Sequence, residues 1–267
     1  FFSSRAKADR SPARRRGPTG PCSDDELVKR IRGEITDSPF QGEGYRKVWA
    51  RLRHRGTRTS KERVRRLMRE HGLQAPYFPT RRRGDRAHSG TVTTERPNEM
   101  WGTDATSVWT RKHGMVTVFL AIDHCTSECV GLHAAQSGTR FEALEPIRQG
   151  VREQFGGYQE DAAEGLTIRH DHGSQFMSRD YQAELRYLGM RSSPAFVAEP
   201  ECNGVAERFV RTLKEQCLWL QTFDTAEDVR AALSVFKETY NHGWLVQKHG
   251  HRTPVEARHH LTVARAA

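Results

Sequence analysis

DHGSQF (residues 171–176) and CNGVAERFVRTLK (residues 202–214) are the two stretches that decide how this chain of 267 residues folds. The first follows LTIRH, an apolar and β-prone run, and its Gly-Ser pair is typical of a turn, so it is expected at the end of a buried strand. The second is typical of a helix that begins at Asn203, a favoured N-cap residue. Each stretch contributes one carboxylate on or beside a regular element, Asp171 and Glu207.

The helix expected over the second stretch has two distinct faces. Apolar residues recur every four positions and predict its buried face: Val205, Phe209 and Leu213. The neighbouring face carries charged residues at offsets of four and three: Glu207, Arg211 and Lys214. A third carboxylate, Asp104, interrupts the strand-like run MWGTDATSVW upstream. The chain therefore offers three carboxylates from segments that are far apart in sequence.

Three carboxylates that meet in a folded protein repel one another unless one takes up a proton or a cation neutralises them. Mg²⁺ is a hard cation that binds one or two carboxylates together with the phosphate oxygens of a substrate. Two such ions, about 3.5–4 Å apart, can hold both the attacking and the leaving oxygen of an in-line phosphoryl displacement. The carboxylates thus predict a metal-dependent reaction at a phosphate group.

The words WGTD (101–104), DHGSQF (171–176) and NGVAERFVRTLK (203–214) resemble the DDE transposase and retroviral integrase superfamily. The second and third carboxylates are separated by 35 residues, which is the spacing of the superfamily's "D, D-35-E" signature. Within the superfamily the chain resembles the second-frame (orfB) transposase of insertion-sequence family three. The resemblance covers roughly residues 24–257.

The resemblance implies a ribonuclease-H-like α/β fold, with a mixed five-stranded sheet and flanking helices behind a small all-α helix-turn-helix module. It implies that Asp104, Asp171 and Glu207 are the catalytic residues and hold two Mg²⁺ ions, for which Mn²⁺ can substitute. The implied activity is cleavage of transposon ends and transfer of the 3′-hydroxyl into DNA, that is, DNA integration and recombination. Arg211 and Lys214, on the face of Glu207, are expected to hold phosphates of the transposon end, and the family links a Lys in this L-K word to contact with terminal DNA. The alternative is a solvated helix face.

Charge is unevenly distributed along the chain. Residues 1–95 contain 24 Lys and Arg against 11 Asp and Glu, whereas acidic residues slightly outnumber basic ones in the rest. A basic segment ahead of a carboxylate-bearing one indicates nucleic-acid binding coupled to nucleic-acid chemistry. An Arg-rich composition that merely reflects a GC-rich genome is the alternative interpretation.

Changes in composition divide the chain into five expected segments. They are a disordered basic tail (1–22), a helix-turn-helix DNA-binding module (23–74), a Pro/Arg/Thr linker (75–98), a ribonuclease-H-like catalytic core (99–225), and a C-terminal helix and tail (226–267).

Three short helices are expected in the first module, within SDDELVKRIRGEI, GYRKVWARLRHRG and SKERVRRLMREHG. Ser23 and Ser60 are expected N-caps, and Gly56 and Gly72 are expected to end the second and third helices. The tight turn between the last two helices predicts a helix-turn-helix. The helix that would approach DNA carries four basic residues: Lys61, Arg65, Arg66 and Arg69. The alternative is a helical bundle whose charged face is only solvated.

From Met100 onward the pattern changes to that of a mixed α/β domain. Strands are expected in MWGTDATSVWT, MVTVFLAIDHCT, ECVGLHAAQ, LTIRHD and MRSSPAF, with helices after the third, fourth and fifth of them. A last helix is expected in AEDVRAALSVFKETYNHG. Pro146 is expected to interrupt or kink the helix that follows the third strand.

Other residues are alternative candidates for the same roles. Asp123 rivals Asp104, but acids at strand ends often cap turns. Glu199 and Glu201 rival Glu207, but they lie in a Pro-flanked loop, a poor place to fix a metal ligand. A zinc site and a Ser-His nucleophile are two less favoured interpretations, the first from His124, Cys125, Cys129 and His133 and the second from His172 and Ser174. The last histidines, His249, His251, His259 and His260, are expected in a solvated tail.

The chain has no apolar run of the ~18 residues that a membrane span needs, and no membrane partner is expected. Five Cys at irregular spacings favour a reducing compartment. We therefore expect a cytoplasmic, nucleoid-associated bacterial protein that acts on transposon ends and target DNA. The family implies a homo-oligomer on DNA and a fusion partner from an upstream frame. The alternative functions are a plain metal-dependent nuclease and a catalytically inactive DNA-binding remnant.

Overall fold

A computed structural model gives the coordinates of the chain and describes residues 22–76, 94–194 and 203–266. Most of the expected basic tail and linker, and the loop that contains Glu199 and Glu201, lie outside these residues. The described residues form two compact units, one over 22–38 and 42–76 and the other over the remainder. The five expected segment boundaries stay a prediction.

The first unit is a bundle of three helices, as the sequence predicts. They are α1 (Asp24–Asp37), α2 (Tyr45–His54) and α3 (Lys61–Glu70). The side chains of Ser23 and Ser60 accept hydrogen bonds from the first turns of α1 and α3, so both expected N-caps are confirmed. Gly56 and Gly72 follow α2 and α3 with φ of 80° and 64°, a conformation that glycine adopts without strain.

The core of this unit consists of the apolar residues that recur at helical spacing in the sequence. Its fully buried members are Leu27, Ile31, Val48, Leu52, Val64, Leu67 and Met68. Burying one such side chain contributes roughly 1.5–3 kcal/mol relative to leaving it exposed. The bundle therefore has its own core and does not depend on the second unit for one.

The second unit contains a five-stranded sheet with the order β3-β2-β1-β4-β5. Its strands are β1 (Met100–Thr110), β2 (Gly114–Asp123), β3 (Cys129–Ala135), β4 (Thr167–His170) and β5 (Arg191–Pro194). The first three strands are antiparallel neighbours, whereas β4 and β5 run parallel to β1. The expected mixed five-stranded sheet is confirmed, and its first and fourth strands lie side by side.

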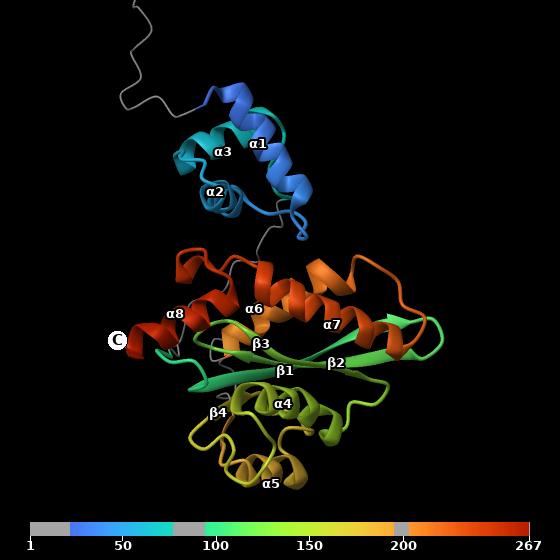
Figure 1. Cartoon of the computed structure of the whole chain (residues 1–267). Helices are drawn as coiled ribbons and strands as arrows, with labels where there is room; N and C mark the ends of the chain where they lie inside the picture. The colour runs from blue at the N-terminus through green and yellow to red at the C-terminus, as the bar shows by residue number, and fades with distance from the viewer. Residues whose placement is uncertain (1–21, 77–93, 195–202, 267) are drawn as a thin grey trace, which may run out of the picture. The chain divides into compact units, whose positions relative to one another are not determined.

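Helices cover both faces of this sheet (Figure 1). They are α4 (Arg140–Phe155), α5 (Arg179–Tyr187), α6 (Gly204–Leu213), α7 (Ala226–Gly243) and α8 (Pro254–Ala266). One apolar core lies between the sheet and α4 and α5, and another lies between the sheet and α6 and α7. The helix α4 runs through Pro146.

A wide turn follows α6 directly. Residues Lys214–Leu218 form a π-helix, in which the backbone N–H of Trp219 donates to the carbonyl oxygen of Lys214, five residues back. Such turns hold one residue more than a regular α-helical turn and are frequent at functional sites. Among the described residues no helix is long and apolar enough to cross a membrane.

Candidate active site

Asp104 lies in the middle of β1 and points to the face of the sheet that α6 covers. Its partner across the β1–β2 pair is Leu120, which packs in the same core as Phe209 and Leu213 of α6. Side chains of directly paired residues project from the same face of a sheet. The next residue, Ala105, packs against the opposite core, beneath α4. The alternation of β1 thus directs Asp104 toward the helix that carries Glu207.

Burial and nearby acids raise the pKa of Asp104 to about 6. Burial is the largest cause, and the negative charges of Asp171 and Glu207 raise the pKa further. A hydrogen bond of 2.7 Å from the backbone N–H of Ala105 to Oδ1 and the positive charge of Lys214 act in the opposite direction. Asp104, Asp171, Glu207 and Lys214 therefore share one electrostatic environment.

Asp171 comes directly after β4, the parallel neighbour of β1. Gly102 pairs with Arg169 in this parallel ladder, so extending the register by two residues brings Asp104 beside Asp171. The backbone N–H of Gly173 donates to Oδ1 of Asp171 at 2.8 Å and fixes this carboxylate in the turn that the Gly-Ser pair predicts. The carboxylate itself is exposed.

His170 attaches the end of β4 to its other neighbour, β5. Its Nδ1 lies 2.7 Å from the carbonyl oxygen of Asp171, and its Nε2 lies 2.8 Å from Oγ of Ser192. The ring also stacks on Phe176. Burial lowers the pKa of His170 and favours the neutral ring, in which Nδ1–H donates to the carbonyl and Nε2 accepts from the hydroxyl.

Glu207 is half-buried in the first turn of α6. The expected N-cap, Asn203, occupies the cap position, but its side chain makes no capping hydrogen bond. Its Nδ2 donates instead to the carbonyl oxygen of Thr103 on β1, at 2.9 Å. The helix buries Phe209 and Leu213 as predicted, together with Ala206 and Thr212, whereas Val205 is only half-buried.

The donor set suits a hard divalent cation, because the three carboxylates offer only oxygen ligands. A cation would also offset the repulsion that raises the pKa of Asp104. In the part of the chain that the structure describes, no three His, Cys, Asp or Glu side chains are close enough to form a metal site as they stand. Asp171 and Glu207 are near enough to Asp104 to raise its pKa, but ligation of one cation would require the three side chains to draw closer. The Cys/His cluster receives no support as a zinc site.

Asp123, the rival of Asp104, has a structural role. It is fully buried, accepts hydrogen bonds from the backbone N–H groups of Thr126 and Asn98, and lies 3.8 Å from the guanidinium of Arg258. It also accepts from the Thr126 hydroxyl. With its oxygens occupied by the turn after β2, Asp123 is a turn-capping residue.

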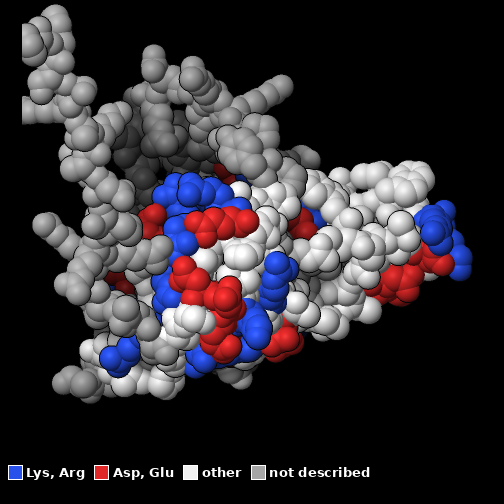
Figure 2. Space-filling model, turned by 90° about the horizontal axis from the view of Figure 1, so that it is seen from above, with Lys and Arg blue, Asp and Glu red and all other residues white. Residues whose placement is uncertain are grey.

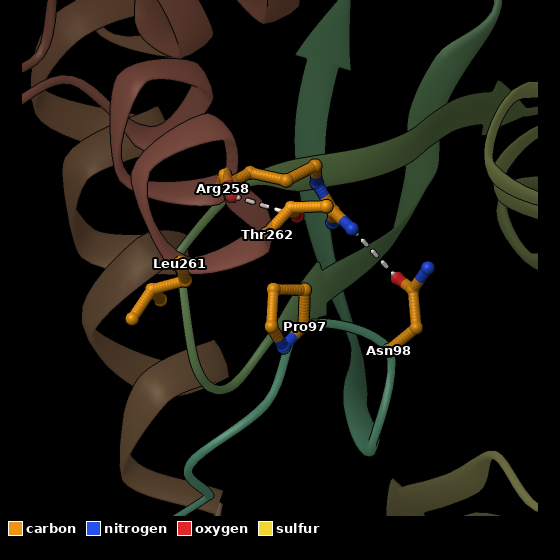
Figure 3. A pocket seen from close by; sticks show the side chains of 5 residues that line it. All are labelled: Pro97, Asn98, Arg258, Leu261 and Thr262. Carbon is orange, nitrogen blue, oxygen red and sulfur yellow. Dashed lines mark hydrogen bonds between the residues drawn. The ribbon is translucent and has the colours of Figure 1, made fainter. Parts of the chain in front are cut away.

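A separate cavity of about 420 Å³ lies between the loop before β1 and α8 (Figure 3). Its lining consists of Pro97, Asn98, Arg258, Leu261 and Thr262, and it contains none of the three carboxylates. Arg258 crosses it to donate to Oδ1 of Asn98 at 3.0 Å. The cavity therefore does not belong to the candidate active site.

Two family descriptions match the chain. An HTH-like domain matches residues 23–83, and an integrase core domain matches residues 94–200 and, in a second form, 188–254. Transposase InsD for insertion element IS2A/D/F/H/I/K of Escherichia coli is 28% identical over 244 residues, which cover 87% of this chain and 78% of InsD. The chain thus has an HTH-like domain followed by an integrase core domain, and it is homologous to the InsD transposases of IS2.

The second E. coli relative is longer. An uncharacterized 48.2 kDa protein of insertion element IS2A is 28% identical over 248 residues, so the chain spans 89% of its own length but only 56% of that protein. Among solved structures, the simian T-cell lymphotropic virus intasome in complex with PP2A regulatory subunit B56 gamma contains a chain that matches 89% of this one and 74% of its own length. The TM-score is 0.51 at 17% identity, which shows a shared fold. The expected insertion-sequence family is confirmed.

The basic residues expected to bind DNA in the HTH-like domain differ in their surroundings. Nζ of Lys61 lies 4.4 Å from the ring centre of Trp49, a cation–π contact at the start of α3. Arg65 forms an ion pair with Glu62. Arg66 pairs with Asp24 and Glu70, each at 2.7 Å, so it ties α3 to α1.

Ion pairs of this kind place acidic side chains beside basic ones. The face shown in Figure 2 accordingly carries both signs of charge next to one another. In α6, Arg211 pairs with Glu215 at 2.7 Å, and Lys214 is half-buried at the start of the π-helix. The assignment of these residues and of Arg69 to DNA contact stays a prediction.

Proposed function

We propose that the chain is a DNA transposase in which Asp104, Asp171 and Glu207 bind divalent metal ions and are the catalytic residues. The observation that supports this best is the effect of the other two carboxylates on Asp104. Burial is the largest cause of the raised pKa of Asp104, and the negative charges of Asp171 and Glu207, from segments separated by tens of residues, raise it further to about 6. Clustered carboxylates do not stabilise a fold by themselves. They are, however, what a site needs in order to bind cations together with a phosphodiester.

Mg²⁺, with Mn²⁺ as a substitute, would supply Lewis-acid stabilisation of the attacking and leaving oxygens at this site. The protein's own part is positioning and charge. Asp104 is held on the central strand by Ala105, and Asp171 is held in its turn by Gly173. Because its pKa is about 6, Asp104 is partly protonated in mildly acidic solution and must lose that proton to become a ligand.

The substrate class proposed is DNA, namely the ends of the mobile element and a target duplex. The HTH-like domain would bind the ends through the basic face of α3, and Arg211 and Lys214 would contact phosphates near the carboxylates. Assembly as a homo-oligomer on DNA and fusion with an upstream-frame partner belong to the same proposal. The longer IS2A relative, of which this chain covers 56%, is consistent with additional sequence in such proteins.

A strand-transfer assay tests the proposal. Linear duplexes that end in the inverted repeats flanking the gene are incubated with the chain, a target plasmid and Mg²⁺ or Mn²⁺. Joined products are expected from the native chain, and Asp171→Asn is expected to abolish cleavage and joining while DNA binding stays within a factor of about three. Cleavage without joined products would indicate a plain nuclease, and binding without cleavage would indicate an inactive remnant.

A further inference from the structure

A small buried contact lies behind Asp104, on the same face of β1. Gly102, two residues before Asp104, faces the side chains of Asn203 and His124, which are 7% and 4% exposed. A Cβ at position 102 would lie 2.6 Å from Oδ1 of Asn203 and 2.6 Å from Nε2 of His124, far closer than side-chain carbons approach other atoms. Only glycine leaves this space to the two polar side chains.

Asn203 is bound to β1 as well as packed against it. Its Nδ2 donates to the carbonyl oxygen of Thr103, the residue between Gly102 and Asp104. His124 is held from behind, because its backbone N–H donates to Met100 and its carbonyl oxygen accepts from Nζ of Lys248. The start of α6 is therefore fixed at one position along β1.

The spacing of residues along β1 and α6 relates this contact to the positions of Asp104 and Glu207. From Gly102 to Asp104 the strand advances by two residues, or roughly 6.6 Å. From Asn203 to Glu207 the helix advances by four residues, or roughly 6 Å, which returns to the same helix face. The two distances nearly match. Contact between Gly102 and Asn203 therefore brings Asp104 and Glu207 together if the axis of α6 runs along β1.

Asp104 does face the helix of Glu207, because its cross-strand partner Leu120 packs in the same core as Phe209 of α6. A slip of one residue along α6 would turn Glu207 by about 100° around the helix axis. Misplacement of a reactive group by even ~1 Å can cost about a hundredfold in rate. Small changes at the anchor should therefore have large effects on the site.

We propose that the contact of Asn203 with Gly102, Thr103 and His124 sets the position of Glu207 relative to Asp104, and that Asn203 is a positioning residue of the active site. The inference rests on the proposed function in that Glu207 acts there as a metal ligand. Asn203 itself, with its polar atoms directed at β1 and the Gly102 space, has no assigned contact with the reacting groups.

Three variants of the full chain test this inference. Asn203→Ala removes the anchor, and Gly102→Ala displaces it by adding the Cβ. Gly204→Ala is the matched control, because a Cβ at this position of the same helix meets no atom within 4 Å. Each is assayed for Mn²⁺ binding by electron paramagnetic resonance, for Mn²⁺-dependent nicking of supercoiled plasmid, and for thermal unfolding, with the first two far below the unfolding temperature.

The first two variants are expected to need at least tenfold more Mn²⁺ for half-saturation and half-maximal nicking. Their affinity for duplex DNA should stay within a factor of about two, and Gly204→Ala should match the native chain. Should Gly102→Ala fail to fold, Asn203→Ala alone decides. A folded Asn203→Ala variant with a native Mn²⁺ requirement would overturn the inference.

A native chain that neither binds Mn²⁺ nor nicks DNA would overturn the proposed function instead. The anchor is then judged by hydrogen–deuterium exchange over α6, which needs neither metal nor activity. Faster exchange of this segment in Asn203→Ala than in Gly204→Ala is expected, and equal protection in the two variants would overturn the anchor as well.

Discussion

Replacement of Asp104 by Asn should stabilise the metal-free protein while it abolishes activity. The pKa of Asp104 is raised from 3.8 to about 6, so the folded protein binds this proton more tightly than the unfolded chain does. Ionisation at neutral pH therefore costs stability. The difference of roughly two pKa units corresponds to about 3 kcal/mol, because each unit is worth 1.36 kcal/mol. Asn can still accept the hydrogen bond from Ala105 and carries no charge.

The sign of the pH dependence follows from the direction of the shift. The cost is absent below about pH 4, where both states hold the proton, grows between pH 4 and 6, and is complete above about pH 7. Asp104→Asn should therefore be up to ~3 kcal/mol more stable than the native chain at pH 7, an increase of several degrees in Tm. The gap should narrow as the pH falls toward 4.

Urea and thermal unfolding in EDTA measure this effect. Asp228→Asn, in the same unit, is a control whose stability should change in the opposite direction. The hydrogen bonds of the α7 capping box lower the pKa of Asp228, so this variant should lose stability at pH 7. Millimolar Mg²⁺ should raise the Tm of the native chain and leave that of Asp104→Asn unchanged. A destabilised Asp104→Asn protein at pH 7, or equal responses of both proteins to Mg²⁺, would refute the electrostatic account of this site.

Three further results are expected. The metal concentration at half-maximal cleavage should rise about tenfold per pH unit below pH 6 and level off above pH 7, since Asp104 must lose its proton; a flat profile from pH 5 to 8 would contradict this. Gly173→Ala should lower cleavage at least tenfold without weakening DNA binding, because its Cβ would lie 2.9 Å from Oδ1 of Asp171; native turnover would show that the turn has room to adjust. Lys61→Ala should reduce the slope of log affinity for DNA against log salt by about one. Arg66→Ala should lower the free energy of unfolding of the first unit by roughly 1 kcal/mol, because its ion pairs are lost. The reverse pattern would make Arg66 the DNA contact and Lys61 the stabilising residue.

The residues that sequence pattern placed best are those under simple periodic constraints. Alternation in β1, a period of four in α6 and turn chemistry after β4 each have a direct physical cause in backbone geometry. These patterns were sufficient to predict the elements that carry Asp104, Asp171 and Glu207, whereas the mixed five-stranded sheet was implied by the family resemblance. They also gave both serine N-caps of the first unit, because capping depends on the three residues that follow.

Contacts between distant segments were not predictable in this way. Asn203 has the sequence context of an N-cap, and its actual partner, Thr103, is a hundred residues away. The late histidines were expected in a solvated tail, which is wrong for His251, since it is buried, and for His249, whose Nε2 lies 2.7 Å from the carbonyl oxygen of Cys125. In both cases the position of the side chain depends on burial of a polar group beside a partner that is distant in sequence. The neighbouring residues in the sequence do not identify that partner.

The π-helical turn after α6 bears on how such chains can diverge in length. Loss of one residue from Lys214–Leu218 would let the segment close as an ordinary α-helix, and the residues after it would rotate by about 100°. The exposed side chains of Trp219 and Leu220 would then face a new direction, although the interval from Asp171 to Glu207 would be untouched. A single-codon deletion here could thus change which surface the protein offers to its surroundings while its chemistry stays in place.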